Sequence, residues 1–173
     1  MTTLLLVRHG ETDWNAEGRL QGQTDRPLSD YGRRQAKQLA EELEGEELEA
    51  IYSSDLARAR ETAEIVGRKL GLPTVLDPDL REKDWGNWEG LTAVERDRVS
   101  FDGEATEAHQ ERILRALRRI SERHSGEGRV LVVTHGGSMR RVQTAAMGMA
   151  LPVVENCGRW LCAYEDGAFR ALD

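Results

Sequence analysis

Two histidines of this chain each follow a short apolar run. The run at 4–7 leads into Arg8 and His9, and the run at 130–134 leads into His135. Continuous apolar runs of this length are typical of strands buried on both faces of a sheet. Ligands of such sheets bind beyond the carboxyl ends of the strands. We therefore expect both histidines to lie in one site that carries out chemistry.

Further polar groups follow other strand-like segments, with Arg58 after the run at 48–52 and Glu82 after a short extended piece. Histidines, arginines and a carboxylate together match phosphoryl transfer through a histidine nucleophile. In that reaction a neutral imidazole attacks phosphorus, cationic groups hold the equatorial oxygens, and an acid protonates the leaving oxygen. Arginine suits the second task because its planar fork binds phosphate in a bidentate manner. Neighbouring arginines also favour the neutral imidazole over the imidazolium, because a second positive charge close to them is disfavoured.

Glycines stand directly after both histidines, at Gly10 and at Gly136-Gly137. A residue without a side chain lets the backbone approach an anion closely. The second pair also opens a segment with helical periodicity, and the amides at the start of a helix favour negative charge. Both glycine positions therefore fit a phosphate site.

The elements that must position these groups can be read from apolar periodicity. Apolar side chains recur at helical spacing in four segments that begin at Ala36, Ala59, Ile113 and Met139, and the last stripe extends to Met149. These segments alternate with the strand-like runs. Such an alternation predicts an α/β fold, a three-layer α/β/α sandwich with a mostly parallel mixed sheet.

The end of the chain has a different pattern. Asp166-Gly167 separates two strand-like runs at 160–164 and 168–172, which is a strong hairpin signal and predicts an antiparallel edge. The chain has 173 residues, without an internal repeat or a Pro/Ser-rich linker. This length suits one core, so we expect a single domain over residues 1–173.

Composition excludes several classes of partner. A formal net charge of −7 argues against a nucleic-acid partner bound by bulk electrostatics, although local arginines can still hold a phosphate. No apolar stretch approaches the roughly 20 residues of a membrane span, and no signal peptide is evident. We therefore expect a cytoplasmic protein without a membrane partner.

Cys157 and Cys162 are expected to be buried or half-buried reduced thiols, because their spacing is a poor zinc signal.

Five ordered blocks of this sequence resemble the histidine phosphatase superfamily, the phosphoglycerate mutase-like proteins. The first block is Leu-Val-Arg-His-Gly-Glu-Thr-Asp-Trp-Asn at 6–15. The others lie at 19–29, 53–63, 80–90 and 133–137. The blocks span nearly the whole chain, which makes the resemblance specific. The pattern is most similar to that of the small phosphatase members, such as α-ribazole phosphatase, and implies the phosphoglycerate mutase-like fold.

The resemblance also implies a role for each matching position. His9 would be the nucleophile that forms a phosphohistidine. The expected catalytic residues are His9, Glu82, His135, Arg8 and Arg58, and the expected substrate-binding residues are Arg8, Asn15, Gln21, Gly22, Arg58, Glu82, His135 and Gly136. Glu82 would protonate the leaving group and later activate water, with Asp84 and Glu89 as competitors for that role. Neither a metal nor a cofactor is expected.

The segment after the Glu82 block separates phosphatases from mutases in this family. Relatives that are mutases resemble each other in a long insertion there, whereas this chain has a short cap at about 91–103. A mutase needs a closed, basic lid to retain its intermediate, and an open cleft favours hydrolysis. The sequence therefore predicts a metal-independent phosphomonoesterase acting on a small phosphorylated metabolite. The alternatives are a cofactor-dependent phosphoglycerate mutase, with a carboxylate held near Arg81, Lys83, Arg96 or Arg98, and an inactive module that binds phosphorylated ligands.

Motifs do not separate the possible substrates, which include α-ribazole phosphate, sugar phosphates, phosphoglycerate and nucleotide monophosphates. His109, His124 and the arginines from 112 to 123 are expected on a solvated helix face. Trp85 and Trp88 are expected to be core or cleft-wall aromatics, with the core preferred. Trp160 and Tyr164 on the terminal hairpin suggest a surface for a homodimer.

Overall fold

The computed structural model describes residues 1–124, 128–149 and 151–172. Its strands are β1 (Thr2–Arg8), β2 (Leu48–Ser53), β3 (Thr74–Leu76), β4 (Arg129–Thr134), β5 (Arg159–Glu165) and β6 (Ala168–Ala171). Its α-helices are α1 (Asp13–Ala16), α2 (Asp30–Glu42), α3 (Ala57–Leu70), α4 (Ala93–Arg96), α5 (Thr106–Arg123) and α6 (Gly136–Met147). Two short 3₁₀ helices, η1 (Pro78–Leu80) and η2 (Gly86–Trp88), lie between β3 and α4.

The strands form one sheet in the order β3-β2-β4-β1-β5-β6. β1 pairs in parallel with β4, and β2 pairs in parallel with both β4 and β3. β5 runs antiparallel to β1, and β6 runs antiparallel to β5. The sheet is therefore mixed and mostly parallel, with the antiparallel hairpin at one edge. This arrangement confirms the predicted fold class.

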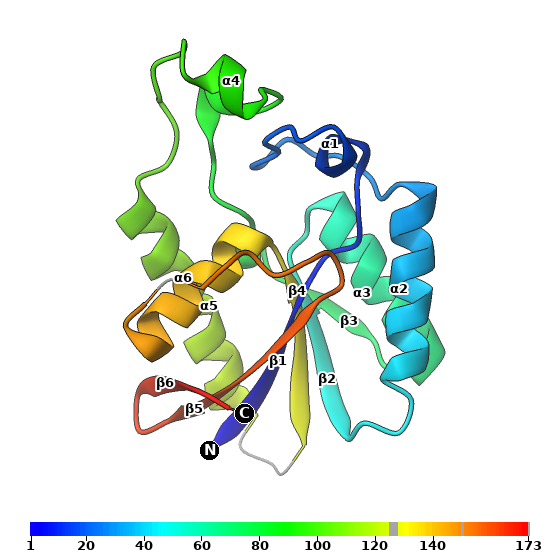
Figure 1. The fold of residues 1–173 in the computed structure, drawn as a ribbon. Coiled ribbons are helices and arrows are strands. Elements are labelled where there is room, and N and C mark those ends of the chain that lie inside the picture. The colour runs from blue at the N-terminus through cyan, green and yellow to red at the C-terminus, as the bar shows by residue number, and fades with distance from the viewer. Residues whose placement is uncertain (125–127, 150, 173) are drawn as a thin grey trace.

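Helices cover both faces of this sheet, as Figure 1 shows, with α2 and α3 on one side and α5 and α6 on the other. Alternate residues of β1 supply the two cores because successive side chains of a strand point to opposite faces. Leu4 and Leu6 lie in the core beneath α5 and α6. Leu5 and Val7 lie in the core beneath α2 and α3. A strand buried on both faces is what a continuous apolar run predicts.

Helix α6 ends earlier than its apolar stripe predicts. Gly148 takes the left-handed conformation with φ of 71° and closes the helix after Met147. Met149, expected on the buried stripe, is therefore beyond the helix and exposed. Glycine ends helices in this way because it lacks the Cβ that makes positive φ costly. Met139 and Val142 of the same stripe are fully buried, as expected.

The predicted hairpin is present, with β5 and β6 joined at Asp166-Gly167. Both turn residues have positive φ, 51° and 81° respectively, which matches the twist of a tight hairpin. Trp160 and Tyr164, expected to be available for a partner subunit, are half-buried and pack against the core beneath α5 and α6.

No helix in the described part of the chain combines the length and apolar character that a bilayer crossing requires.

The cap, residues 91–103, contains the single short helix α4 and stands above the carboxyl ends of the parallel strands (Figure 1). Trp85 and Trp88 stack beneath it with ring centroids 6.1 Å apart, and Phe101 packs against both. The Trp88 indole donates a hydrogen bond to the Val99 carbonyl over 2.8 Å. Of the two expected positions, the core is not found, because both tryptophans are half-buried at the base of the cap. Trp85 lines a pocket beside Glu82, which fits the alternative of a cleft wall.

Helix α5 offers a direct test of the packing. Leu117 is fully buried in the core beneath α5 and α6, while the next residue, Arg118, is exposed. We expect Leu117→Ala to lower the free energy of unfolding by about 2–5 kcal/mol through lost contacts and a new cavity. Urea denaturation measures this change. Arg118→Ala is the matched control, with an expected change within about 0.5 kcal/mol, and equal effects of the two variants would contradict the packing.

Candidate active site

The parallel pairing of β1 with β4 brings the two strand-end histidines together. Arg8 is in register with Thr134, and the His9 amide donates to the Thr134 carbonyl over 3.0 Å. The rings of His9 and His135 therefore lie with centroids 5.2 Å apart and planes inclined by 60°. They are only 3% and 0% exposed. The expected meeting of both histidines at one sheet edge is found in the structure.

Two hydrogen bonds define the state of His9. Nδ1 lies 2.7 Å from the Gly10 carbonyl oxygen, and Nε2 lies 3.3 Å from Nε of Arg58. A carbonyl only accepts and a guanidinium only donates, so Nδ1 carries the proton and Nε2 carries the lone pair. Burial, followed by the charges of Arg58 and Arg8, holds the pKa of His9 well below its usual range. The imidazole is thus neutral, with Nε2 as its basic atom.

Arg58 stands in the first turn of α3 and is 1% exposed. Besides His9, its guanidinium donates to the Gly22 carbonyl over 2.6 Å and to the Thr24 carbonyl over 3.1 Å. All three partners are neutral acceptors. Desolvation by burial lowers the pKa of Arg58 to about 10, so the group remains charged at neutral pH. A buried cation held by neutral acceptors retains the capacity to attract an anion.

Arg8 and His135 complete the expected phosphate pocket. The Arg8 side chain donates to the Val154 carbonyl over 2.8 Å, but its Nε is buried without a hydrogen-bond partner among the described residues. Nε2 of His135 lies 2.9 Å from the Ser54 hydroxyl, whereas Nδ1 has no partner there. Buried polar atoms without partners are rare, so these two atoms need an explanation. A Cβ on Gly136 would crowd the Arg8 side chain and Val153.

The loop after α1 contributes the other expected binding residues. Gly22 has φ of 56°, and a Cβ at this position would collide with the Glu89 carboxylate, so the turn requires glycine. The buried side chain of Gln21 accepts a hydrogen bond from the Thr12 hydroxyl over 2.8 Å. Asn15 closes a capping box with Thr12 at the start of α1. These contacts fix the loop beside Arg58.

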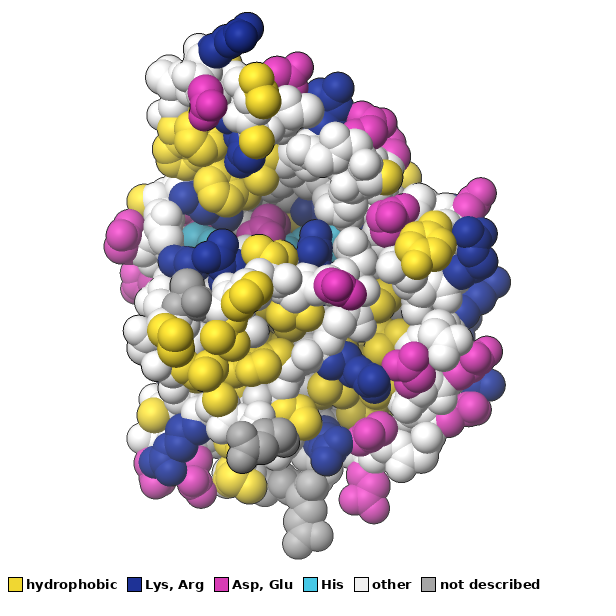
Figure 2. Space-filling model, in the orientation of Figure 1, with side chains coloured by type: hydrophobic (Ala, Val, Ile, Leu, Met, Phe, Trp, Pro, Cys, Tyr) yellow, Lys and Arg dark blue, Asp and Glu magenta, His cyan; other side chains and the backbone are white. Residues whose placement is uncertain are grey.

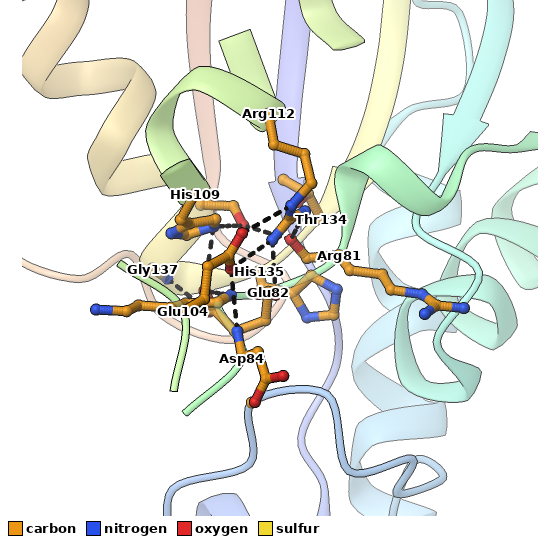
Figure 3. Close-up of polar contacts among 12 residues, drawn as sticks. Arg81, Glu82, Asp84, Glu104, His109, Arg112, Thr134, His135 and Gly137 are labelled. Atoms are coloured by element: carbon orange, nitrogen blue, oxygen red, sulfur yellow. Dashed lines mark hydrogen bonds and ion pairs between the residues drawn. The ribbon is translucent and has the colours of Figure 1, made fainter. Parts of the chain in front are cut away.

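Glu82 lies beside the segment that follows β4. Its two carboxylate oxygens accept from the backbone amides of Lys83 and Gly137, each over 2.8 Å. The second amide belongs to the first turn of α6, which begins directly after His135. Glu82 is thereby joined to the segment that carries the second histidine. Figure 3 shows the Glu82 side chain with His135 and Gly137 nearby.

The two competing carboxylates are occupied elsewhere. Glu89 accepts from the backbone amides of Gln23, Thr24 and Trp85, at 2.7–3.0 Å, and holds two loops together. Asp84 is exposed and accepts from the Gly86 amide over 2.7 Å. Glu82 also accepts from two backbone amides, so its assignment as the acid rests on the resemblance.

His109 is buried, so the expectation that it lies on a solvated helix face is wrong. It is 2% exposed, with Nε2 2.9 Å from the Ser138 hydroxyl and 3.7 Å from Oε1 of Glu82 (Figure 3). Its position four residues before Ile113 continues the apolar stripe of α5, and this spacing was the signal available in the sequence. Burial is the main cause of its lowered pKa.

Arg112 and His124 also depart from the expected solvated face. Arg112 donates to the carbonyls of Asp79, Arg81 and Glu82 and forms an ion pair with Glu104 over 2.8 Å. It thus holds the backbone on both sides of the candidate acid (Figure 3). His124, at the end of α5, lies 2.8 Å from a Glu49 carboxylate oxygen and 3.0 Å from the Tyr52 hydroxyl.

Two residues to which the sequence analysis assigned no role hold the backbone around His9. The Thr62 hydroxyl accepts from the Gly10 amide over 3.0 Å and donates to the Arg58 carbonyl over 2.7 Å. Asn156 donates to the His9 carbonyl over 3.0 Å and to Asn15 over 3.3 Å. Thr62 was expected on the buried stripe of its helix, while Asn156 lies in a loop without a sequence signal. Both residues hold the backbone of the turn that contains His9 and Gly10.

The described residues contain no group of three or more metal-binding side chains that would hold a metal ion. Cys157 and Cys162 are free, half-buried and buried respectively, and burial raises the pKa of each thiol to about 12. Thiols in this state are poor nucleophiles and poor metal ligands at neutral pH. The structure thus bears out the expectation that both are ordinary reduced thiols.

The fold and the site together define a three-layer α/β protein with a paired-histidine site at the carboxyl edge of its sheet. The chain belongs to the histidine phosphatase superfamily, because the model of branch 1 of that superfamily matches residues 4–171. The solved structure of YhfR from Bacillus stearothermophilus has a TM-score of 0.90 and 36% identity, covering 99% of this chain and 95% of that one. The family predicted from the five blocks is confirmed.

Two relatives from Arabidopsis thaliana show the range of names within this family. Phosphoglycerate mutase-like protein 4 is 41% identical over 169 residues, which cover 87% of this chain and 73% of that protein. The metal-independent phosphoserine phosphatase is 39% identical over 161 residues, which cover 82% of this chain and 67% of that protein. The second relative supports a phosphatase function in this superfamily. The names do not assign a substrate to this chain.

The lowered pKa values of His9 and His135 predict how stability depends on pH. Below about pH 6.5 the unfolded state binds protons at both histidines before the folded state does. Stability from these groups is therefore present above that pH and is lost as the pH falls, by up to about 1.4 kcal/mol per pH unit for each histidine. Urea denaturation at about pH 7.5 and about pH 5.5 measures this loss.

The matched comparison is the His9→Asn, His135→Asn double variant, which lacks both titrating groups. We expect its free energy of unfolding to fall less than that of the unchanged protein over the same interval. Carboxylates titrate in both proteins, so their contribution to the change in the free energy of unfolding cancels in this comparison. An equal fall in the two proteins would show that the histidines are not held neutral by burial.

Proposed function

We propose that this chain is a phosphomonoester hydrolase that forms a phosphohistidine on His9 and needs neither a metal nor a cofactor. The observation that carries the proposal is the state of His9, a buried neutral imidazole with the lone pair of Nε2 beside Arg58. Cationic and donor groups that lack anionic partners surround this atom, as expected for a site that receives a phosphoryl group.

The first half of the reaction transfers the phosphoryl group to the protein. The lone pair of His9 Nε2 attacks phosphorus, and the bond from phosphorus to the ester oxygen breaks. Glu82 in its protonated form gives its proton to that leaving oxygen. Arg8 and Arg58 hold the equatorial oxygens while negative charge moves through them, and His135 adds a further donor.

The second half returns the protein to its starting state. Glu82, now a carboxylate, takes a proton from a water molecule that attacks phosphorus. The bond from phosphorus to Nε2 breaks and its electron pair returns to the imidazole. Inorganic phosphate then leaves with its charge still matched by the arginines. Each proton that Glu82 gives in the first half is replaced in the second.

The short cap, with two of the four carboxylate candidates paired or exposed, favours hydrolysis over the mutase reaction. Arg81, a candidate for a carboxylate site, forms a bidentate ion pair with Asp55 at 2.6 and 2.7 Å. Arg98 is exposed on the short cap. A cap of this size leaves water free to reach the intermediate. We therefore infer a small phosphorylated substrate, no nucleic-acid partner and release of inorganic phosphate.

Replacement of the nucleophile is the first test. We expect His9→Ala to lower the hydrolysis of p-nitrophenyl phosphate by about a thousandfold or more, measured as release of p-nitrophenol. Activity of the unchanged protein should persist in excess EDTA. His124→Ala, a histidine that lies outside the site, is the matched control. Full activity of His9→Ala, or inhibition by the chelator, would overturn the proposal.

Trapping of the intermediate tests the alternatives. After incubation with a labelled phosphomonoester, the unchanged protein should carry a labelled phosphoryl group through an acid-labile, alkali-stable bond. The His9→Ala variant should carry no such label. A chain that binds substrate but forms no such bond would be an inactive binding module. Conversion of 3-phosphoglycerate to 2-phosphoglycerate faster than phosphate release would instead identify a mutase.

Glu82→Gln tests the acid and base role separately. The proton matters most for a poor leaving group, so we expect a loss of about 10²–10⁴ with an alkyl phosphate. The first step with p-nitrophenyl phosphate should be slowed less, because p-nitrophenolate leaves without a proton. Rapid quench should then find more phosphohistidine on the variant than on the unchanged protein. Equal slowing of the first step with both esters would contradict the assignment.

A further inference from the structure

His109 is a buried histidine beside the candidate acid, and the reaction proposed above gives it no role. It stands in the first turn of α5, and its Nε2 lies 3.7 Å from Oε1 of Glu82. This distance is too long for a hydrogen bond but short enough for an electrostatic contact. Both side chains line a small pocket of about 110 Å³. Figure 2 shows histidine and acidic side chains together on the floor of a hollow, with basic side chains around it.

Ser138 determines which nitrogen of His109 carries the proton. The Ser138 hydroxyl lies 2.9 Å from Nε2 of His109 and donates to the Arg81 carbonyl over 3.2 Å. A hydroxyl has a single proton and a carbonyl can only accept, so the Ser138 oxygen must accept from His109. Nε2 therefore carries the proton. The N–H group that Ser138 receives is also the group that lies 3.7 Å from the Glu82 carboxylate.

His109 presents this N–H group without a full positive charge. Burial is the main cause of its lowered pKa, and the nearby carboxylate of Glu82 acts in the opposite direction. Arg112 and Arg141 add to the lowering, while Glu104 opposes it. The imidazole is therefore neutral at neutral pH. A neutral donor attracts a carboxylate without forming an ion pair with it.

Two arginines of the phosphate pocket attract the same carboxylate. The charge of Glu82 acts on Arg8 at the end of β1 and on Arg58 in α3. A carboxylate that moved into direct contact with either arginine would cancel charge that a phosphate needs. Two backbone amides hold the carboxylate oxygens, and His109 contacts one of these oxygens from α5. The contact from α5 therefore adds to the forces that oppose such a movement.

We propose that His109 is a positioning residue for the acid and base role of Glu82, whose carboxylate its Nε2–H group holds toward the leaving oxygen. The inference rests on the proposed function, in which Glu82 gives and takes the proton. His109 acts through Glu82 and does not itself contact the substrate. Its N–H group stabilises most strongly the carboxylate that forms in the first half of the reaction, because hydrogen-bond donors favour an ionised acceptor.

The proton position on His109 tests this geometry without requiring turnover. The chain has four histidines, so loss of one set of signals in His109→Leu assigns the ring nitrogens of His109. We expect nitrogen-15 NMR near neutral pH to show a protonated Nε2 and an unprotonated Nδ1. Glu82→Gln should shift the Nε2 signal of His109 and leave the signals of His124 in place. A proton on Nδ1, or an unshifted Nε2 signal, would overturn the proposal.

Removal of the N–H group should affect most the esters that need an acid. With glycerol 3-phosphate, an alkyl ester, we expect His109→Leu to lower kcat about 5–10-fold and to change KM less than about twofold. The first step with p-nitrophenyl phosphate should be slowed less, because its leaving group needs no proton. Ser138 still donates to the Arg81 carbonyl in this variant. Equal slowing with both esters would show a general structural effect and contradict the proposal.

His109→Gln is the conservative variant, because its side-chain amide offers a neutral N–H donor of similar reach. We expect it to keep at least about half of the kcat of the unchanged protein with glycerol 3-phosphate. His124→Leu, which removes a histidine outside the site, is the matched control and should keep the full rate. Equal losses in His109→Gln and His109→Leu would contradict a role for the N–H group.

A double-variant cycle connects the effect to Glu82. In the Glu82→Gln background, His109→Leu should change kcat for glycerol 3-phosphate by less than about twofold, because the carboxylate that His109 positions is already absent. The same substitution with Glu82 intact gives the 5–10-fold loss expected above, an order-of-magnitude figure of about one hydrogen bond. Equal losses in the two backgrounds would show that His109 does not act through Glu82.

These measurements separate the inference from the proposed function. If the unchanged protein hydrolyses glycerol 3-phosphate and His109→Leu does so at the same rate, the hydrolase is supported and the role of His109 is wrong. If neither ester is hydrolysed but the expected proton position and the shift in Glu82→Gln are found, the contact is supported and the hydrolase is wrong.

Discussion

The guanidinium of Arg58 is buried beside His9, and the arrangement of the site follows from the cost of that burial. An isolated buried charge costs several kcal/mol even after the protein relaxes. Here two backbone carbonyls and one imidazole nitrogen reduce the cost, while a carboxylate in direct contact would cancel the charge that a phosphate needs. Burial, followed by this same charge, holds the pKa of His9 well below its usual range. In the proposed hydrolase, the contact between Arg58 and His9 therefore serves both the nucleophile and the binding of the anion.

Backbone geometry maintains this interaction. The loop that offers carbonyls to Arg58 contains Gly22, whose positive φ and lack of a side chain admit the Glu89 carboxylate. Glu89 in turn accepts hydrogen bonds from the amides of Gln23 and Thr24. On the other side, Thr62 links the Gly10 amide to the Arg58 carbonyl. The catalytic geometry thus depends on loop contacts that carry no reactive group themselves.

Much of this could be predicted from the sequence, for identifiable reasons. Apolar runs that end in His9 and His135 must place them at one edge if the strands are parallel neighbours, and Asp166-Gly167 fixes the hairpin through local turn chemistry. Other features depend on tertiary packing. The burial of His109 depends on Ser138 and Glu82 from distant segments, and the place of Trp85 and Trp88 depends on a cap that folds back over them. An aromatic residue alone does not distinguish a core from a cap.

The pairing of β1 with β4 has a consequence for how the protein acquires its site. Arg8 and Thr134 are adjacent strand partners although most of the chain lies between them. The entropy of closing this loop is lost before the contacts between β1 and β4 can form, and topologies with distant pairings fold slowly. During synthesis the first strand must wait for β4 and α6 before His9 meets His135. The candidate site is therefore complete only when segments from both ends of the chain have paired.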